Sequence, residues 1–112
     1  MKKIEAIIRP EKLDAVRAAL ATVGYAGLMI TEIEGHGKQK GITQQWRGKE
    51  YKVELLPKVK IEIVAHDQDV DKIMGAIVKV ATTGNLGDGK IFVYPVETAL
   101  RIRTGEKGDS AI

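Results

Sequence analysis

Residues 58–64 read Lys58-Val59-Lys60-Ile61-Glu62-Ile63-Val64, and charged and apolar residues alternate from Lys58 to Ile63. Successive side chains of an extended chain point to opposite faces, so Val59, Ile61 and Ile63 share one face. The charged residues between them share the other face. This stretch therefore predicts a β-strand that buries one face and presents charges on the other.

Three further segments have extended patterns. In the segment that begins at residue 3, Ile4, Ala6 and Ile8 fall on one face. We expect this strand to end at Arg9-Pro10, because a proline restricts the residue before it to an extended or turn conformation. The segments are residues 3–9, 27–34 and 91–96.

Two segments change to a helical period. Between residues 11 and 23, apolar residues recur three or four positions apart, and Gly24 can end the helix. The second helix is expected to begin after Asp67 or Asp69, either of which can cap it. Its apolar stripe is formed by Val70, Ile73, Met74, Ile77 and Val80.

The order strand, helix, strand, strand, helix, strand consists of two βαβ halves. It predicts an α+β, ferredoxin-like single domain over residues 1–112, which matches a length of 112 residues. Both helices would cover one face of an antiparallel sheet. The other face then needs cover, and β-branched residues there would favour association of subunits.

A long loop is expected between the second and third strands, over about residues 37–55. Residues 35–49 contain few apolar side chains and show no period. Loops of this length inside a small domain are usually functional. Trp46, Arg47 and Tyr51 are of the kind that anchor interfaces, so we expect a mobile loop that contacts partner proteins.

Composition excludes several classes of protein. The chain has no cysteine, so disulfides and thiolate metal sites are ruled out. Its formal charge of +3 is mild and its charges are mixed, which gives no reason to expect nucleic-acid binding. We see no signal peptide and no apolar stretch near the roughly 20 residues that span a bilayer, and we expect a cytoplasmic protein.

Three segments combine glycine with positive charge, which is typical of anion binding. They are residues 35–41, 84–90 and 101–105, the last of which begins the polar tail 101–112. Gly84, Gly89 and Lys90 have the spacing of a Walker A loop, but Ile91 follows where Ser or Thr is required, and the loop leads into a strand. We therefore expect a polyphosphate ligand without hydrolytic machinery; ordinary turns with solvated charges are the alternative.

Catalytic residues are not evident. His36 and His66 are the only histidines, and neither has a metal partner at a suitable spacing. One alternative is a small nucleotide phosphotransferase that uses His36. Another is an RNA-binding module that stacks bases on Phe92 and Tyr94.

Four separated motifs together resemble the PII signal-transduction family, in the same order and without insertions. They are Trp46-Arg47-Gly48-Lys49-Glu50-Tyr51, residues 58–64, residues 83–93, and Arg101-Ile102-Arg103-Thr104-Gly105-Glu106. The resemblance covers essentially the whole chain. It implies a homotrimer that binds ATP or ADP in the clefts between subunits and reports nitrogen status.

The resemblance also implies the nucleotide-binding residues. The phosphates would be held by Gly87, Asp88, Gly89, Lys90, Arg101 and Arg103. Glu62, Ile63 and Val64 would line the adenine and ribose, and Gly37 and Lys38 would close the site. Met29 would face adenine, where many relatives carry a hydroxyl residue.

By the same resemblance, 2-oxoglutarate would bind beside MgATP. Gln39 would help to coordinate Mg²⁺, and 2-oxoglutarate would chelate the same ion through its oxygens. Lys58 would pair with the distal carboxylate. Backbone groups of Gln39, Lys40, Gly41 and Gly87 would complete this site.

Partner proteins implied by the family are an ammonium transporter, glutamine synthetase or its modifying enzymes, and an arginine-pathway kinase. Contact with a membrane would occur only through the transporter, whose pore Arg47 could enter. Tyr51 is a possible site of nucleotidylation. Position 49 is Lys49, where the cyanobacterial branch has a phosphorylated serine, so that modification is not expected here.

Overall fold

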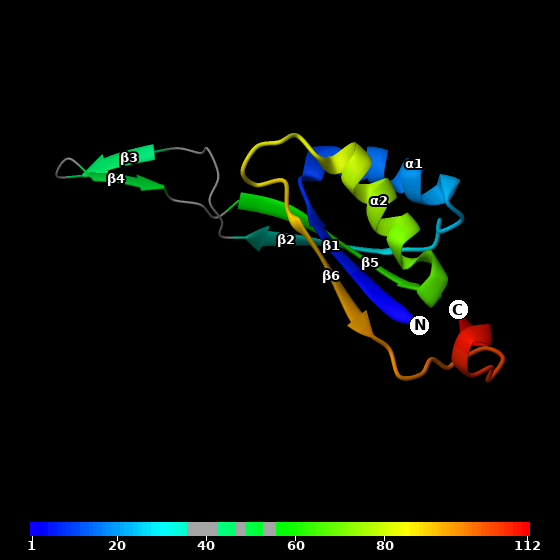
Figure 1. Ribbon diagram of the computed structural model, residues 1–112. Helices are drawn as coiled ribbons and strands as arrows, with labels where there is room; N and C mark the ends of the chain where they lie inside the picture. The colour runs from blue at the N-terminus through cyan, green and yellow to red at the C-terminus, as the bar shows by residue number, and fades with distance from the viewer. Residues whose placement is uncertain (36–42, 47–48, 53–55) are drawn as a thin grey trace.

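The computed structural model describes residues 1–35, 43–46, 49–52 and 56–112, with side chains described for residues 1–35 and 56–112. Its main elements are β1 (Lys2–Ile8), α1 (Leu13–Thr22), β2 (Met29–Gly35), β5 (Leu56–Ala65), α2 (Val70–Ala81) and β6 (Lys90–Pro95). Short 3₁₀ turns occupy Pro10–Lys12, Asp67–Asp69 and Gly108–Ala111. The predicted βαββαβ order and the ferredoxin-like α+β fold are confirmed (Figure 1).

The four main strands form one antiparallel sheet in the order β2-β5-β1-β6. Ile4 of β1 pairs with Ile63 of β5 on one side and with Val93 of β6 on the other. The segment 58–64 therefore lies inside the sheet, and β2 and β6 form its edges.

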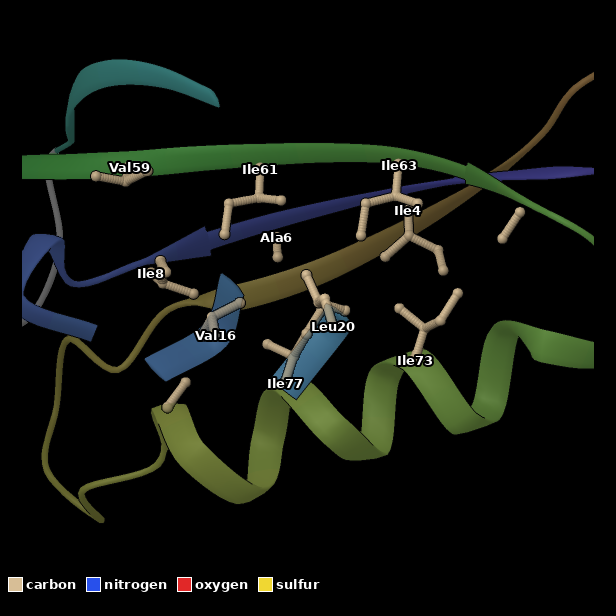
Figure 2. Close-up of a cluster of buried hydrophobic side chains, with 12 residues drawn as sticks. Ile4, Ala6, Ile8, Val16, Leu20, Val59, Ile61, Ile63, Ile73 and Ile77 are labelled. Atoms are coloured by element: carbon tan, nitrogen blue, oxygen red, sulfur yellow. The ribbon is translucent and has the colours of Figure 1, made fainter. Parts of the chain in front are cut away.

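The core lies between the sheet and the two helices, as the alternation predicts. The apolar faces of β1 and β5 are at most 4% exposed, and Val16, Leu20, Ile73 and Ile77 pack against them from the helices. Figure 2 shows these side chains meeting between the strands and α2. The helix period ends at Gly24, which adopts a φ of 93°, as expected for a residue that terminates a helix.

The other face of the sheet differs from a simple apolar surface. The side-chain ammonium of Lys3 lies 2.8 Å from a carboxylate oxygen of Glu62 and 5.7 Å from the centre of the Tyr94 ring. The Lys60 ammonium approaches the other Glu62 oxygen at 3.4 Å. Because the period of two places lysine and glutamate on this face, it carries interleaved charges rather than the continuous β-branched surface that would by itself drive association.

The connection between β2 and β5 is long, as predicted, but it is not irregular throughout. Strands β3 (Thr43–Trp46) and β4 (Lys49–Lys52) pair antiparallel as a separate two-stranded sheet, with Trp46 opposite Lys49. The expectation of no regular structure over 35–49 is therefore wrong at β3. The hairpin was not predicted because Thr43, Gln44 and Gln45 are all polar and show no alternation of apolar and polar residues.

The expectation that Asp67 or Asp69 caps α2 through its side chain is wrong. Asp69 occupies the N-cap position, but neither it nor Asp67 makes a capping hydrogen bond. The Asp69 carboxylate instead accepts a hydrogen bond from the Tyr25 hydroxyl. This contact ties the end of α1 to the start of α2.

Candidate functional site

The loop of residues 83–90 is organised around the side chain of Asp88. This carboxylate accepts hydrogen bonds from the backbone N–H groups of Thr83 at 2.8 Å and Gly84 at 2.9 Å, and from the Thr83 hydroxyl at 2.5 Å. The Thr83 bonds, followed by those from Gly84 and Arg9, hold the pKa of Asp88 well below its ordinary value. The carboxylate is therefore ionised and engaged by its own loop, so any contact with phosphate would fall to the Asp88 backbone N–H.

Two cations hold the same loop from the sheet side. The guanidinium of Arg9 donates to the Leu86 carbonyl oxygen at 2.8 Å and to Asp88 at 3.2 Å. The Lys58 ammonium donates to the Gly87 carbonyl oxygen at 2.6 Å. Burial, and next the charge of Arg9, lower the pKa of Lys58.

Gly89 is required where the loop meets the sheet. It has a φ of 105°, and a Cβ at this position would lie 1.7 Å from the Ile7 carbonyl oxygen. The loop then continues directly into β6, which confirms that it is not a P-loop before a helix.

The register of the sheet separates the candidate residues into two groups. Lys90 lies opposite Ile7 and Pro95 lies opposite Lys2, so the loop and the tail adjoin opposite ends of β6 (Figure 1). Six extended residues span roughly 17 Å. We call these the loop end, with Lys58 and residues 87–90, and the tail end, with Met29, residues 62–64, Arg101 and Arg103.

At the tail end, the expected adenine-lining residues share one open pocket of about 800 Å³. Met29, Glu62, Ile63 and Val64 line it, together with residues that include Tyr25 and His66. Met29 is 61% exposed, so its side chain is available to a ligand or a neighbouring subunit.

The Glu62 carboxylate in this pocket is held by two lysines. The hydrogen bond from Lys3 comes first, and Lys60 adds to it, so that the pKa of Glu62 is lowered. Glu62 is thus an ionised acceptor with a fixed position, suited to the hydroxyl or amino groups of a nucleoside.

The turn after β6 presents the two tail arginines. The Arg101 guanidinium donates to Glu106 at 2.9 Å, and the Arg101 backbone N–H donates to the Glu106 carbonyl at 2.8 Å. The Thr104 hydroxyl donates to the same Glu106 carboxylate at 2.9 Å. This bracing fixes the segment that carries Arg103 and leaves Ile102 98% exposed.

Comparison with known proteins identifies the family. A family model described as Nitrogen regulatory protein P-II matches residues 1–106. The chain is 58% identical over 112 residues to the Nitrogen regulatory protein P-II of Pasteurella multocida, with all of both chains covered. The chain belongs to the PII family.

Other relatives agree. Nitrogen regulatory protein P-II 1 of Escherichia coli K12 is 58% identical over its whole length. Nitrogen regulatory protein P-II 2 of Methanothermobacter thermautotrophicus is 54% identical, with 97% of it covered. Membership in this family makes the chain a regulator of nitrogen signalling.

Several residues that the PII resemblance assigns lie outside the described part of the chain. They are Gly37, Lys38, Gln39, Lys40, Gly41 and Arg47, and the side chains of Trp46 and Tyr51; His36, the candidate of the phosphotransferase alternative, also lies there. Their roles with Mg²⁺, 2-oxoglutarate and partners stay predictions. Among residues 1–35, 43–46, 49–52 and 56–112, no three His, Cys, Asp or Glu side chains gather as a metal site. In the same ranges, no helix combines the length and apolarity needed to cross a membrane.

The contact of Arg9 with the loop of residues 83–90 was not predicted from the sequence. The contact joins residues 79 positions apart, and no local period marks it. The only available signal was position, since Arg9 directly follows β1 at the end of the sheet where the glycine-rich loop was expected.

Proposed function

We propose that this PII protein binds ATP or ADP, binds 2-oxoglutarate when MgATP is present, and passes that state to partner proteins through residues 37–55. It acts as a regulator in the cytoplasm and catalyses no reaction of its own. The observation that carries the nucleotide part is the placement of two incomplete half-sites at opposite ends of one sheet.

The loop end has the properties of a phosphate site. Gly87 and Gly89 both have positive φ, so backbone N–H groups can approach an anion without side-chain interference. Lys90 adds a positive charge where the loop enters β6. The pocket that contains Glu62, which is the larger of the two described pockets, lies at the other end of the sheet from these groups.

The tail end supplies what the loop end lacks. It combines the pocket around Glu62 with Arg101 and Arg103, which can bond phosphate oxygens. A head-to-tail contact between copies would bring one chain's loop end to the next chain's tail end, and such contacts close into rings. Exposed apolar side chains near the tail end support this homotrimer, among them Met29 at 61% and Ile102 at 98%.

The 2-oxoglutarate proposal rests on the position of Lys58. Its Cγ lies 3.5 Å from where a Cβ of Gly35 would be, at the end of β2. The segment assigned to Mg²⁺ and 2-oxoglutarate begins four residues later, at Gln39. A cation at this point suits a carboxylate, and a hard metal ion can take oxygen ligands from phosphate and keto acid together.

Calorimetry tests the proposal. ADP and ATP are expected to bind without other ligands, whereas 2-oxoglutarate gives a binding signal only with MgATP. By linkage, 2-oxoglutarate then raises ATP affinity by the same factor. A protein that binds neither nucleotide, or that binds 2-oxoglutarate equally with and without MgATP, contradicts the proposal; phosphate transfer lost in His36→Ala would favour the phosphotransferase instead.

Partner capture completes the test. The protein in each ligand state is presented to an ammonium transporter, glutamine synthetase, its modifying enzymes and an arginine-pathway kinase. We expect capture by at least one of them to depend on ligand and on Arg47. Capture that survives both Arg47→Ala and deletion of residues 42–54 would exclude this segment as the output surface.

A further inference from the structure

Arg9 and Lys58 contact the backbone of the phosphate loop rather than its outer surface. We propose that these two side chains are positioning residues, which fix the peptide groups of residues 86–88 so that their N–H groups face the nucleotide phosphates. The inference rests on the proposed nucleotide site and adds Arg9, a residue to which that proposal gives no role.

The orientation of the peptide groups follows from the two carbonyl contacts. The Leu86 and Gly87 oxygens accept hydrogen bonds from Arg9 at 2.8 Å and from Lys58 at 2.6 Å. In a trans peptide the N–H points opposite to the C=O, and the described chain has no cis peptide bond. The N–H groups of Gly87 and Asp88 therefore point away from the two cations.

Both cations act from the same side of the loop. Arg9 directly follows Ile8, and Lys58 directly precedes Val59, the residue that pairs with Ile8 in the neighbouring strand, so both side chains start from the same end of the sheet. The two N–H groups consequently face the same way, and successive N–H groups on one side form an anion-binding concavity. Side chains that never touch the phosphate would thus create the surface that binds it.

Arg9 has a second positioning role, which is to orient the carboxylate of Asp88. Its carboxylate holds the Thr83 and Gly84 N–H groups, and a negative charge beside a phosphate site opposes binding. Arg9 donates to this carboxylate at 3.2 Å and keeps it turned inward. The Arg9 side chain is only 14% exposed, so it pairs with Asp88 largely away from water.

The test compares Arg9→Met with Arg17→Met. Arg17 is exposed on α1, so its replacement makes the same change of charge away from the loop. We expect Arg9→Met to weaken ADP and pyrophosphate binding in parallel by roughly tenfold, as for loss of a charge-assisted hydrogen bond, and Arg17→Met to change either by less than about twofold. Arg9→Lys should restore part of the affinity, because one ammonium cannot reproduce the two-sided guanidinium contact.

A measurement without ligand separates positioning from general damage. Amide hydrogen exchange of Gly87 and Asp88 should accelerate in free Arg9→Met, while exchange in β1 and β5 stays as in the wild type. If Arg9→Met does not fold, Thr83→Val removes one bond to Asp88 and is expected to give the same pattern with roughly threefold weaker binding.

The outcomes distinguish this inference from the proposed function. Wild-type protein that binds neither ADP nor pyrophosphate overturns the proposed nucleotide site. Wild-type binding with unchanged affinity in folded Arg9→Met, or in Thr83→Val where Arg9→Met does not fold, overturns the positioning role alone. Parallel loss for ADP and pyrophosphate, with faster exchange confined to the loop, supports it.

Discussion

The two ends of the sheet differ in how their polar and apolar side chains are engaged. At the loop end, the polar side chains make hydrogen bonds within the protein. Asp88 accepts hydrogen bonds from Thr83 and Arg9, and Lys58 donates to a backbone carbonyl of the loop. At the tail end, a pocket stays open and apolar side chains such as Met29 remain exposed. A rigid backbone suits a phosphate of fixed shape, whereas an open pocket suits a surface that a neighbouring subunit completes.

The largest expected effect is at the junction of the loop with β1. Gly89→Ala places a Cβ against the Ile7 carbonyl oxygen in a conformation with positive φ. The clash is between Cβ and the backbone of β1, which cannot move aside as a flexible side chain could. We expect a loss of more than about 3 kcal/mol in the free energy of unfolding, measured with urea.

Gly84→Ala is the matched control for that change. Gly84 also has positive φ, at 86°, but nothing lies within 4 Å of its Cβ position. The substitution should cost only about 1 kcal/mol, the conformational penalty alone. Equal losses in the two variants would mean that contact with β1 does not set the geometry of the loop.

Mixing of variants tests whether the two ends meet in one site. Lys90→Ala damages the loop end and Arg103→Ala damages the tail end, and each variant alone should bind ADP at least tenfold more weakly. Co-refolded equal mixtures should regain high affinity in roughly a quarter of the sites, since each intact half has an even chance of being chosen.

Calorimetric stoichiometry measures this recovery. A mixture that binds no better than its two components would show that each site belongs to one chain. That result would leave the division between loop end and tail end without functional meaning. A mixture of two loop-end variants, Lys90→Ala and Arg9→Met, serves as the control and should show no recovery.

The main sheet could be predicted because its signal is local. From Lys58 to Ile63 each apolar residue follows a charged one, and burial of one face removes Val59, Ile61 and Ile63 from water together. The hairpin at β3 and β4 has no such signal, and its strands are recognised only by their pairing, which places Gln45 opposite Glu50. A pairing of polar residues cannot be recognised from one strand alone.

The sequence could predict which segments form the candidate site, but it could not predict how their side chains contact one another. Glycines and lysine mark residues 84–90 as an anion-binding loop, yet they do not reveal that the Asp88 carboxylate turns inward. The Asp88 carboxylate also contacts Arg9, 79 positions away, and Asp69 contacts Tyr25, 44 residues away. Contacts between distant positions carry the site, and single-sequence patterns contain no record of them.

The smallest expected effect is the pH dependence that Asp88 contributes to the loop end. Its pKa is lowered in the folded protein, first by the Thr83 hydrogen bonds, so the unfolded chain binds the proton more tightly. The stabilisation is therefore fully present above the unfolded pKa of about 4 and is lost as pH falls toward the lower folded pKa. Asp88→Asn should be less stable than wild type at neutral pH, and the difference should shrink as the pH is lowered below about 4.

Asp71→Asn is the control for this change, because Asp71 carries an exposed carboxylate on α2. This substitution should leave the pH profile of stability nearly as in the wild type. Urea unfolding between neutral and acidic pH measures all three proteins. A constant difference between wild type and Asp88→Asn across that range would show that the ionised carboxylate does not brace the loop, and the contrast between a rigid loop end and an open tail end would lose its main electrostatic support.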